Sequence, residues 1–287
     1  FFAGVRPVRT IAGVHHPLDK LDRTVDLVVI RENLEDLYAG FELDGINLPQ
    51  GIALGIPPHA KVALKVISEE RTSNIVHYAF GYARRHGRKR VTCVHKANIL
   101  KQTDGLFLQM FRGIAETYPD IAADDVIVDA MAMRLVRTPE QFDVLVCPNL
   151  YGDILSDLAA ALGGGLGVVP GANIGDGIAL FEAVHGTAPD IAGQGKANPT
   201  ALLLSACMML DHLAESNARE HPAVGDQYEY GEVAEDLRTA IERVIRDDRE
   251  CVTPDIGGAG TTQEMAEAIA GEYAAVVDED MSDDFGR

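Results

Sequence analysis

Four segments of the chain share one pattern, a short run of β-branched and other apolar residues that ends abruptly in polar ones. They are Asp26–Asn33, Arg90–Asn98, Asp125–Asp129 and Asp143–Asn149. Short continuous apolar runs are typical of buried strands in an α/β sheet. Between them, Thr72–His86 and Asp104–Tyr118 carry apolar residues at helical spacing. The pattern therefore predicts an α/β fold in which strands and helices alternate.

Polar side chains stand where these predicted strands end. In open α/β sheets, ligands bind outside the carboxyl ends of the strands. In this chain those ends carry Arg31, Lys96, Asn98, Asp129 and Asn149. The sequence therefore predicts a polar site along one edge of the sheet.

Five further segments lie outside this alternation. Glycine and proline punctuate residues 40–60, which predicts a loop or hairpin arm toward a partner subunit. Residues 163–177 are glycine-rich, and we interpret them as a crossing between domains or a ligand-lining loop. An apolar helix is expected over Asn198–His212, and Thr261 with Glu264 forms a capping box that begins a last helix running to about Val277. We expect the acidic tail, residues 278–287, to be solvated and disordered.

Charge and composition exclude several functional classes. The 287 residues include 25 Lys and Arg against 44 Asp and Glu, a formal charge of −19. Such a chain repels phosphate backbones and anionic membranes, so it is not expected to bind nucleic acid or lipid. No apolar run reaches membrane-spanning length. The four cysteines are far apart and three lie in apolar contexts, which argues against a zinc cluster and suits a reducing cytoplasm.

The segment Asn149–Asp157 carries the sharpest chemical signal. Asp153 and Asp157 are four residues apart on a predicted helix, so their carboxylates share one face. Oxygen donors in this arrangement suit Mg²⁺ or Mn²⁺. The alternative is that Asp153 complements the helix dipole and Asp157 is a solvated surface residue.

Other candidate residues are weaker taken one at a time. Asp129 is a third metal ligand or a helix N-cap, and Lys96 is a base or an ordinary strand-end lysine. Arg6 and Arg31 suit the carboxylates of an anionic substrate. The loop His185–Gly193 is long and polar enough to wrap a nucleotide, although the chain has no Rossmann or P-loop fingerprint.

Taken together, the motifs resemble those of the isocitrate and isopropylmalate dehydrogenase family of metal-dependent decarboxylating dehydrogenases. The segments that carry the resemblance are Val5–Arg9, Arg31–Gly40, His95–Ile99, Asp129–Met133, Asn149–Asp157, Pro170–Asp176, His185–Gly193 and Ala197–Thr200. Thr253–Thr262 and the apolar helix after Asn198 look most like NAD-dependent isocitrate dehydrogenase.

The resemblance implies specific roles at the substrate. Arg6, Arg31 and Asn98 would bind a polycarboxylate, and Tyr38 would return a proton after decarboxylation. Asp153 and Asp157 would hold Mg²⁺ or Mn²⁺ together with Asp129 from a second subunit. Lys96, also from that subunit, would help to remove the hydroxyl proton. The active unit would then be a homodimer or a higher homo-oligomer with shared sites.

The resemblance also implies a non-Rossmann site for NAD. The residues expected to bind the adenosine half are His185, Gly186, Thr187, Ala188, Asp190, Ile191 and Asn198. A carboxylate at Asp190 would accept hydrogen bonds from the ribose and repel a 2′-phosphate, whereas relatives that use NADP resemble Lys-Tyr at the Asp190–Ile191 pair. We therefore expect NAD rather than NADP.

For domain organisation, the resemblance implies a two-domain fold. Residues 1–163, with the arm 40–60, would form a small domain for dimerisation, substrate and metal. Residues 164–277 would be the C-terminal part of a large, NAD-binding domain, followed by the tail 278–287. The rest of that large domain, roughly one hundred residues, is expected before Phe1.

Several alternatives stay open. The substrate could instead be isopropylmalate, homoisocitrate or a tartrate-type acid, because the residues that choose among them would lie mostly before Phe1. The chain could also belong to a different functional class, as a non-catalytic regulatory subunit or an inactive fragment. The presence of Tyr38, Lys96 and all three metal aspartates favours a catalytic chain.

Overall fold

The computed structural model describes residues 1–19, 23–44, 55–57, 59–220 and 227–284. Seven strands form one sheet in the order β6-β5-β7-β2-β1-β8-β9, and β3 pairs with β4. By contacts between residues, the chain divides into two compact units. Unit 1 comprises residues 1–5, 27–156 and 174–178, and unit 2 comprises residues 6–26, 157–173 and 179–287.

Unit 1 contains the parallel strands that the apolar runs predict. They are β2 (Asp26–Glu32), β5 (Arg90–His95), β6 (Ala122–Ile127) and β7 (Val144–Cys147). The pairs Arg31↔Cys147, Cys93↔Val146 and His95↔Ile127 set their register. Because all three pairings are parallel, the polar residues after these strands share one edge, as predicted.

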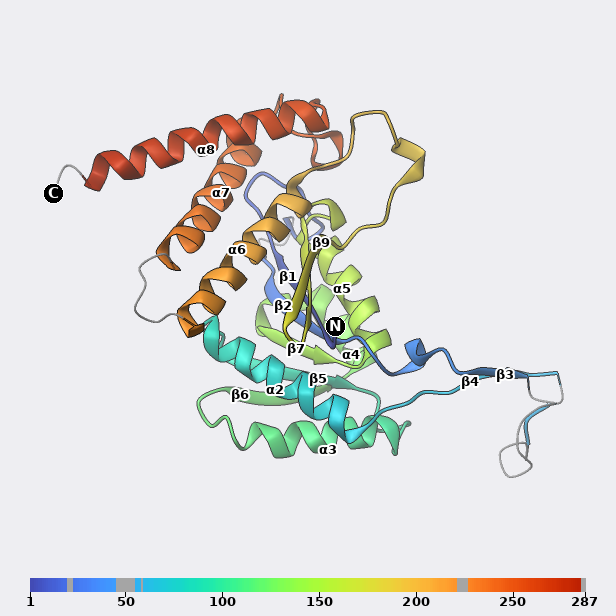
Figure 1. The fold of residues 1–287 in the computed structure, drawn as a ribbon. Helices are drawn as coiled ribbons and strands as arrows, with labels where there is room; N and C mark the ends of the chain where they lie inside the picture. Colours follow the sequence, from blue (N-terminus) through green and yellow to red (C-terminus); the bar gives the residue numbers. More distant parts are fainter. Residues whose placement is uncertain (20–22, 45–54, 58, 221–226, 285–287) are drawn as a thin grey trace. The chain divides into compact units, whose positions relative to one another are not determined.

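The helices of unit 1 are α2 (Glu69–Arg85), α3 (Thr103–Ala115) and α4 (Val128–Arg137), and most of α5 (Asn149–Gly163) also belongs to it. Helices α2 and α3 pack on each other and run along β5 (Figure 1). Their contact is aromatic, since Phe80 stacks on Phe111 with ring centroids 5.5 Å apart. The core of unit 1 therefore lies between these two helices and the parallel strands.

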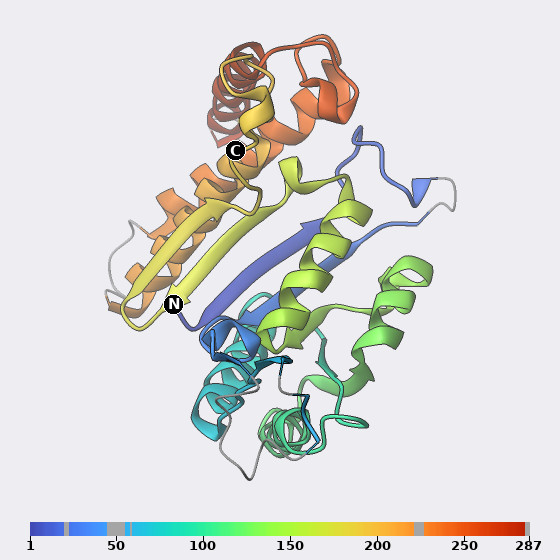
Figure 2. The same ribbon diagram turned by 90° about the vertical axis from the view of Figure 1, so that its right-hand side faces the viewer.

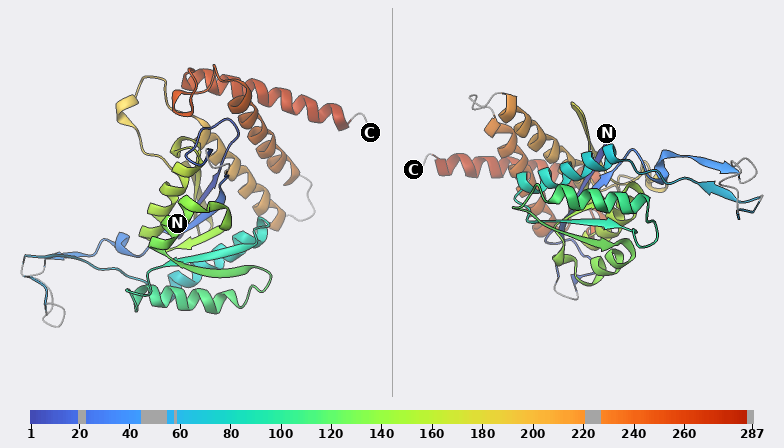
Figure 3. Two further views of the ribbon diagram at one scale, coloured as in Figure 1. Left: turned by 180° about the vertical axis from the view of Figure 1, so that it is seen from behind. Right: turned by 90° about the horizontal axis from the view of Figure 1, so that it is seen from below.

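The predicted arm is described only at its base. Strands β3 (Glu42–Asp44) and β4 (Lys61–Ala63) pair antiparallel, with Leu43 opposite Val62. This narrow ribbon projects from the strands and helices of unit 1 (Figure 3). Residues 45–54 and 58 lie outside the described residues, so contact of the arm with a partner subunit stays a prediction.

Unit 2 is built around three consecutive helices, α6 (Thr200–Glu220), α7 (Gln227–Asp247) and α8 (Thr262–Asp284). Helix α7 packs against both α6 and α8. A buried apolar cluster joins α7, the start of α8 and preceding loops through residues such as Ile241, Met265 and Ile256. The capping box is confirmed, because Thr261 N–H donates to Glu264 Oε2 at 2.8 Å and Glu264 N–H to Thr261 Oγ1 at 3.2 Å.

The glycine-rich segment 163–177 passes from unit 2 into unit 1 after Asn173, as the crossing interpretation predicted, but it is not a loop throughout. After a short 3₁₀ turn it forms β8 (Pro170–Gly175), next to β9 (Ile178–Ala183). Ser205 of α6 bonds both strands, accepting from Gly171 N–H at 3.2 Å and donating to Glu182 O at 2.9 Å. Helix α6 accordingly runs beside β8 and β9 (Figure 2). A Cβ atom at Gly171 would stand 2.9 Å from Val184 Cγ2 and 3.1 Å from Glu182 O, so the glycine gives β8 room beside the end of β9.

The acidic end of the chain also differs from the expectation. Helix α8 continues to Asp284 instead of ending near Val277, and only residues 285–287 lie outside the described residues. Arg243 of α7 explains the extension, because its guanidinium bonds Glu272 at 3.1 Å and Glu279 at 3.0 Å. An ion pair between helices thus supports a turn whose own sequence is unfavourably acidic.

Two further outcomes concern the whole chain. The predicted domain boundary after residue 163 stays a prediction. By contacts between residues, the two units divide within α5, after Ser156, and residues 6–26 belong to unit 2. Strand β1 (Ala3–Arg9) contributes to both. Within the described part of the chain, none of the helices has the length and apolar character of a membrane span.

Candidate functional site

Arg31 is the centre of a polar cluster in unit 1. It follows the apolar part of β2, and its side chain is only 7% exposed. Its Nε and Nη2 atoms donate to Asn149 Oδ1 at 2.9 and 2.7 Å, and Nη1 donates to Asp153. Asn149 begins α5 directly after β7, so the end of one strand and the start of the next helix meet at the guanidinium.

Tyr38 completes this cluster from the short 3₁₀ helix Leu37–Ala39. Its hydroxyl donates to Asp153 Oδ2, and the Arg31 guanidinium lies over its ring at 4.8 Å. The hydrogen bond to Asp153, and secondarily burial, raise the pKa of the phenol above its usual range. Tyr38 therefore stays protonated at neutral pH and can supply a proton. We define the Arg31 cluster as Arg31, Tyr38, Asn149 and Asp153.

Gly152 allows Arg31 to lie this close to α5. A Cβ atom at position 152 would stand 2.7 Å from Arg31 Cγ and 2.8 Å from its Cβ. Contacts between carbon atoms this short are strongly repulsive. The glycine in the Asn149–Asp157 motif thus has a packing role beside the two carboxylates.

Lys96 and Asp129 form a second group in unit 1. Lys96 follows β5, and its Nζ pairs with the Asp129 carboxylate. That pairing lowers the pKa of Asp129. Asp129 lies in the first turn of α4, which begins at Val128 after the cap residue Ile127. The N-cap alternative for Asp129 is therefore wrong, because β6 already ends at Ile127 and that residue is the cap.

The remaining substrate candidates are Arg6 and Asn98. Arg6 in β1 faces Asp157 of α5, with Nη1 3.8 Å from Oδ1, and both belong to unit 2. Asn98 is exposed in the turn after Lys96. Each of the three predicted metal carboxylates therefore faces one cation that was predicted to act on the substrate. The pairs are Asp153 with Arg31, Asp157 with Arg6, and Asp129 with Lys96.

The donor set suits a hard divalent cation only if ligands come from more than one chain. Asp153 and Asp157 lie one turn apart on α5 and offer carboxylate oxygens, the donors that Mg²⁺ and Mn²⁺ prefer. In the described ranges of this single chain, no three His, Cys, Asp or Glu side chains gather closely enough to hold a metal ion. A third ligand from a partner subunit, as predicted for Asp129, is consistent with that arrangement.

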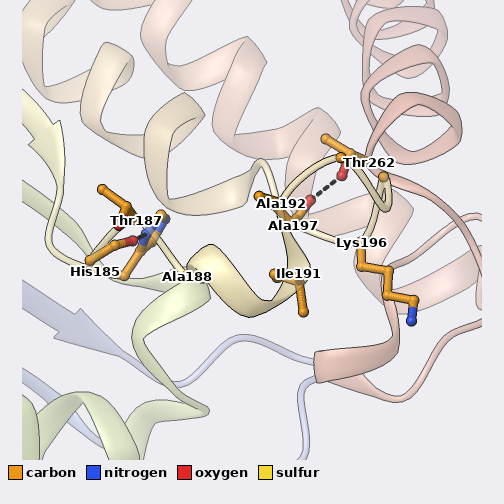
Figure 4. A pocket seen from close by; sticks show the side chains of 11 residues that line it. His185, Thr187, Ala188, Ile191, Ala192, Lys196, Ala197 and Thr262 are labelled. Carbon is orange, nitrogen blue, oxygen red and sulfur yellow. Dashed lines mark hydrogen bonds between the residues drawn. The ribbon is translucent and has the colours of Figure 1, made fainter.

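The predicted nucleotide loop forms a pocket in unit 2. Its lining includes His185, Gly186, Thr187, Ala188 and Ile191 from the predicted set, together with Gly195, Lys196 and Thr262 (Figure 4). The Thr262 hydroxyl donates to Ala197 O at 2.6 Å and closes the loop against the start of α8. The pocket measures about 150 Å³. This is below the roughly 300–1,000 Å³ of pockets that enclose whole ligands, so it suits one part of a dinucleotide.

Two residues of the predicted nucleotide set do not line this pocket. Asp190 lies in the short 3₁₀ helix Pro189–Ile191, exposed, and its carbonyl accepts from Gln194 Nε2 at 2.8 Å. Asn198 points to Asp255, and its Nδ2 donates to Asp255 Oδ2 at 3.0 Å. Ala188 has a positive φ of 43°, which few residues other than glycine adopt. The loop is therefore held in a specific conformation beside Asp190.

Sequence reasoning missed a buried ionic group in unit 1. Lys65 lies between Asp36 and Asp104, at 3.1 and 3.0 Å, and both aspartates are fully buried. A lysine in the apolar stretch Val62–Ile67 was the available signal. Its meaning depends on which carboxylates the fold brings to it.

Known proteins that resemble this chain belong to one family of dehydrogenases. The family model described as isocitrate/isopropylmalate dehydrogenase matches residues 1–269. The mitochondrial catalytic subunit 5 of NAD isocitrate dehydrogenase from Arabidopsis thaliana is 46% identical to this chain over 93% of the chain's length. A 3-isopropylmalate dehydrogenase of Archaeoglobus fulgidus is 44% identical over 94% of this chain and 72% of its own length.

The solved structures agree on the fold. Isocitrate dehydrogenase from Methylococcus capsulatus superposes with a TM-score of 0.80 at 46% identity, covering 95% of this chain and 73% of that one. The chain spans 64% of the length of the Arabidopsis relative.

Proposed function

Because the chain belongs to the isocitrate/isopropylmalate dehydrogenase family, we propose that it is a subunit of an enzyme that oxidatively decarboxylates a 2-hydroxy polycarboxylate with NAD. Isocitrate, converted to 2-oxoglutarate, is the substrate we favour. The observation that carries the proposal is the Arg31 cluster, where a buried guanidinium, a carboxylate and a protonated phenol meet at one strand edge.

The reaction needs four tasks. The hydroxyl oxygen loses a proton, its carbon loses a hydride to NAD, the carboxylate β to the new ketone leaves as CO₂, and a proton returns to carbon. A bound Mg²⁺ or Mn²⁺ supplies Lewis acidity at the hydroxyl and ketone oxygen. Asp153 and Asp157, with Asp129 of a partner subunit, are the residues we propose to hold it.

The chain's own side chains take the other tasks. Arg31 and Arg6, with Asn98, bind the substrate carboxylates, and Arg31 is pre-positioned by Asn149. Tyr38 returns the proton, since a phenol is protonated at neutral pH and the Tyr38 hydroxyl lies in the Arg31 cluster beside Asp153. Lys96 of a partner subunit helps to remove the hydroxyl proton, and to reach it the Lys96 side chain must leave Asp129, with which it pairs in this structure.

We further propose that Asp190 selects NAD. A carboxylate beside the ribose accepts its hydrogen bonds, whereas a 2′-phosphate would face a like charge. Two like charges about 4 Å apart cost about 1 kcal/mol even in water, and lost hydrogen bonds to a charged acceptor add about 1.5–3 kcal/mol. The expected preference for NAD in kcat/KM is at least about tenfold. Asp190→Lys with Ile191→Tyr should erode it, and a preference of the wild type for NADP would contradict the assignment.

The competing substrates are isopropylmalate and homoisocitrate, and a non-catalytic regulatory subunit is the alternative from another class. Initial rates of NADH formation with each acid, Mg²⁺ and the full-length protein distinguish them. We expect activity with isocitrate and a loss of at least about a hundredfold in Asp153→Asn. Activity with only one of the other acids would identify that acid as the substrate. No activity with any of them would favour a non-catalytic regulatory subunit.

Shared sites require a homodimer or a higher homo-oligomer. Sedimentation of the active protein tests this directly, and an active monomer would exclude the roles given to Lys96 and Asp129. The four cysteines are free, three of them buried, which suits the reducing compartment proposed here, the cytoplasm.

A further inference from the structure

The buried group Asp36–Lys65–Asp104 has no part in the proposed chemistry. The Lys65 ammonium contacts one oxygen of each aspartate and lies 4.3 Å from the centre of the Tyr151 ring. Its side chain is 12% exposed and both aspartate side chains are fully buried. Removing charges from water is costly, and such groups persist only when their remaining oxygens are also hydrogen-bonded.

Those remaining bonds reach three separate segments of unit 1. Asp104 Oδ2 accepts from the Lys96 N–H at 2.6 Å. Asp36 Oδ1 accepts from the Leu37 N–H at 2.8 Å, and its Oδ2 accepts from the Leu150 N–H at 3.0 Å. Leu37 precedes Tyr38 and Leu150 follows Asn149, so each amide belongs to a segment that carries a residue of the proposed site.

The backbone at Asp36 gives independent support. Its φ is +68° with ψ −149°, a conformation that is strained for a residue with a Cβ atom. Such strain persists only where surrounding contacts over-determine the position. Here the Asp36 N–H donates to Val66 O at 2.8 Å, next to Lys65. The segment that presents Tyr38 is thus fixed from the segment that carries Lys65.

We propose that Lys65 is a positioning residue, which through Asp36 and Asp104 holds the segments of Tyr38, Lys96 and Asn149 in one mutual arrangement. The assignment of a catalytic purpose rests on the proposed function, whereas the link among the three segments does not. A neutral side chain at position 65 leaves two buried carboxylates without their counter-charge. Without the ammonium that lies between them, the two carboxylates are no longer held in place, and their bonds to the three amides weaken.

Two variants and one control test the proposal. Lys65→Met keeps length and removes the charge. Asp104→Asn has one oxygen fewer, so it serves either the Lys96 N–H or the Lys65 ammonium but not both. The control is Asp143→Asn, since Asp143 is also partly buried and accepts from Arg88 at 3.0 Å and from Lys89 N–H at 2.6 Å. These bonds lie at the amino ends of the strands, opposite the proposed site.

The first measurement is hydrogen exchange of individual amides in the full-length protein without substrate. Lys65→Met should accelerate exchange at Leu37, Lys96 and Leu150 by at least about tenfold relative to the core amides of α2. Asp104→Asn should accelerate Lys96 more than the other two, and it decides the matter if Lys65→Met fails to fold. The control should accelerate none of the three selectively. Unchanged exchange at these amides would overturn the proposal.

The second measurement separates positioning from simple stability. With isocitrate, both variants should lower kcat by at least about tenfold and change KM less, whereas Asp143→Asn should change neither. Selective acceleration of exchange with an unchanged kcat would overturn the positioning role. If the wild type is inactive toward every hydroxy acid, the proposed function fails, and the exchange pattern alone decides whether Lys65 links the three segments.

Discussion

The contact between Gly152 and Arg31 makes a quantitative prediction, because a single methyl group tests it. Gly152→Ala places a Cβ atom 2.7 Å from Arg31 Cγ and 3.3 Å from Arg31 Cα. The side chain cannot simply turn away, since Asn149 and Asp153 hold its guanidinium. Either α5 shifts away from β2 or the bonds of Arg31 are broken.

Two opposing terms set the magnitude. Replacing glycine by alanine inside a helix normally stabilises by about 0.5–1 kcal/mol. Forcing an extra methyl group into packed surroundings costs about 1–3 kcal/mol. A broken hydrogen bond of a charged group would add about 1.5–3 kcal/mol. We therefore expect Gly152→Ala to lower the free energy of unfolding by up to about 2.5 kcal/mol if the bonds of Arg31 persist, and by about 1.5–5.5 kcal/mol if one of them is broken.

Urea unfolding of Gly152→Ala beside Gly113→Ala provides the assay. Gly113 lies in α3 of the same unit, and a Cβ atom there would meet nothing within 4 Å. The control should gain about 0.5–1 kcal/mol, so the same substitution has opposite signs at the two sites. An equal gain at both would refute the close packing of Arg31 on α5.

Three further outcomes follow from local contacts. Glu264→Ala removes the reciprocal cap with Thr261 and should cost about 1 kcal/mol in thermal unfolding. Burial raises the pKa of the Cys207 thiol to about 11, so a thiol reagent at about pH 8 should modify it only after denaturant is added. The pKa of Tyr38 is raised in the folded protein, so the phenol stabilises the fold at pH values below its pKa in the unfolded chain, about 10. That contribution is lost as the pH rises through the pKa of the folded protein. Tyr38→Phe should therefore flatten the alkaline loss of stability, measured by thermal melting at a series of pH values.

The parts of the fold that depend on local signals could be predicted. The runs ending at Arg31 and Asn149 are continuous and β-branched, so they predicted buried parallel strands, and the cap at Thr261 is encoded within four residues. Strand β8 could not be predicted, because glycine and proline favour a loop by composition, and only the contact of Gly171 with Ser205 shows the strand's environment. The extension of α8 likewise depends on Arg243, a residue of another helix.

Some residues of the candidate site could likewise be predicted from local sequence signals, and others could not. Arg31 and Asp153 were predicted from strand ends and helical spacing, and the structure joins them directly. The role of Lys65 depends on two buried aspartates that are distant in sequence, so the lysine could not be singled out from its own stretch of chain. Which subunit uses Asp129 is likewise a property of an assembly that one chain does not contain.

The central claim is that the Arg31 cluster carries out oxidation followed by decarboxylation, with Tyr38 returning the last proton. Counting products from isocitrate, NAD and Mg²⁺ with the full-length protein tests it most directly. The wild type should release NADH and CO₂ in equal amounts, and Tyr38→Phe should form both at least about tenfold more slowly. NADH without matching CO₂ in the wild type, or an undiminished rate in Tyr38→Phe, would contradict the account.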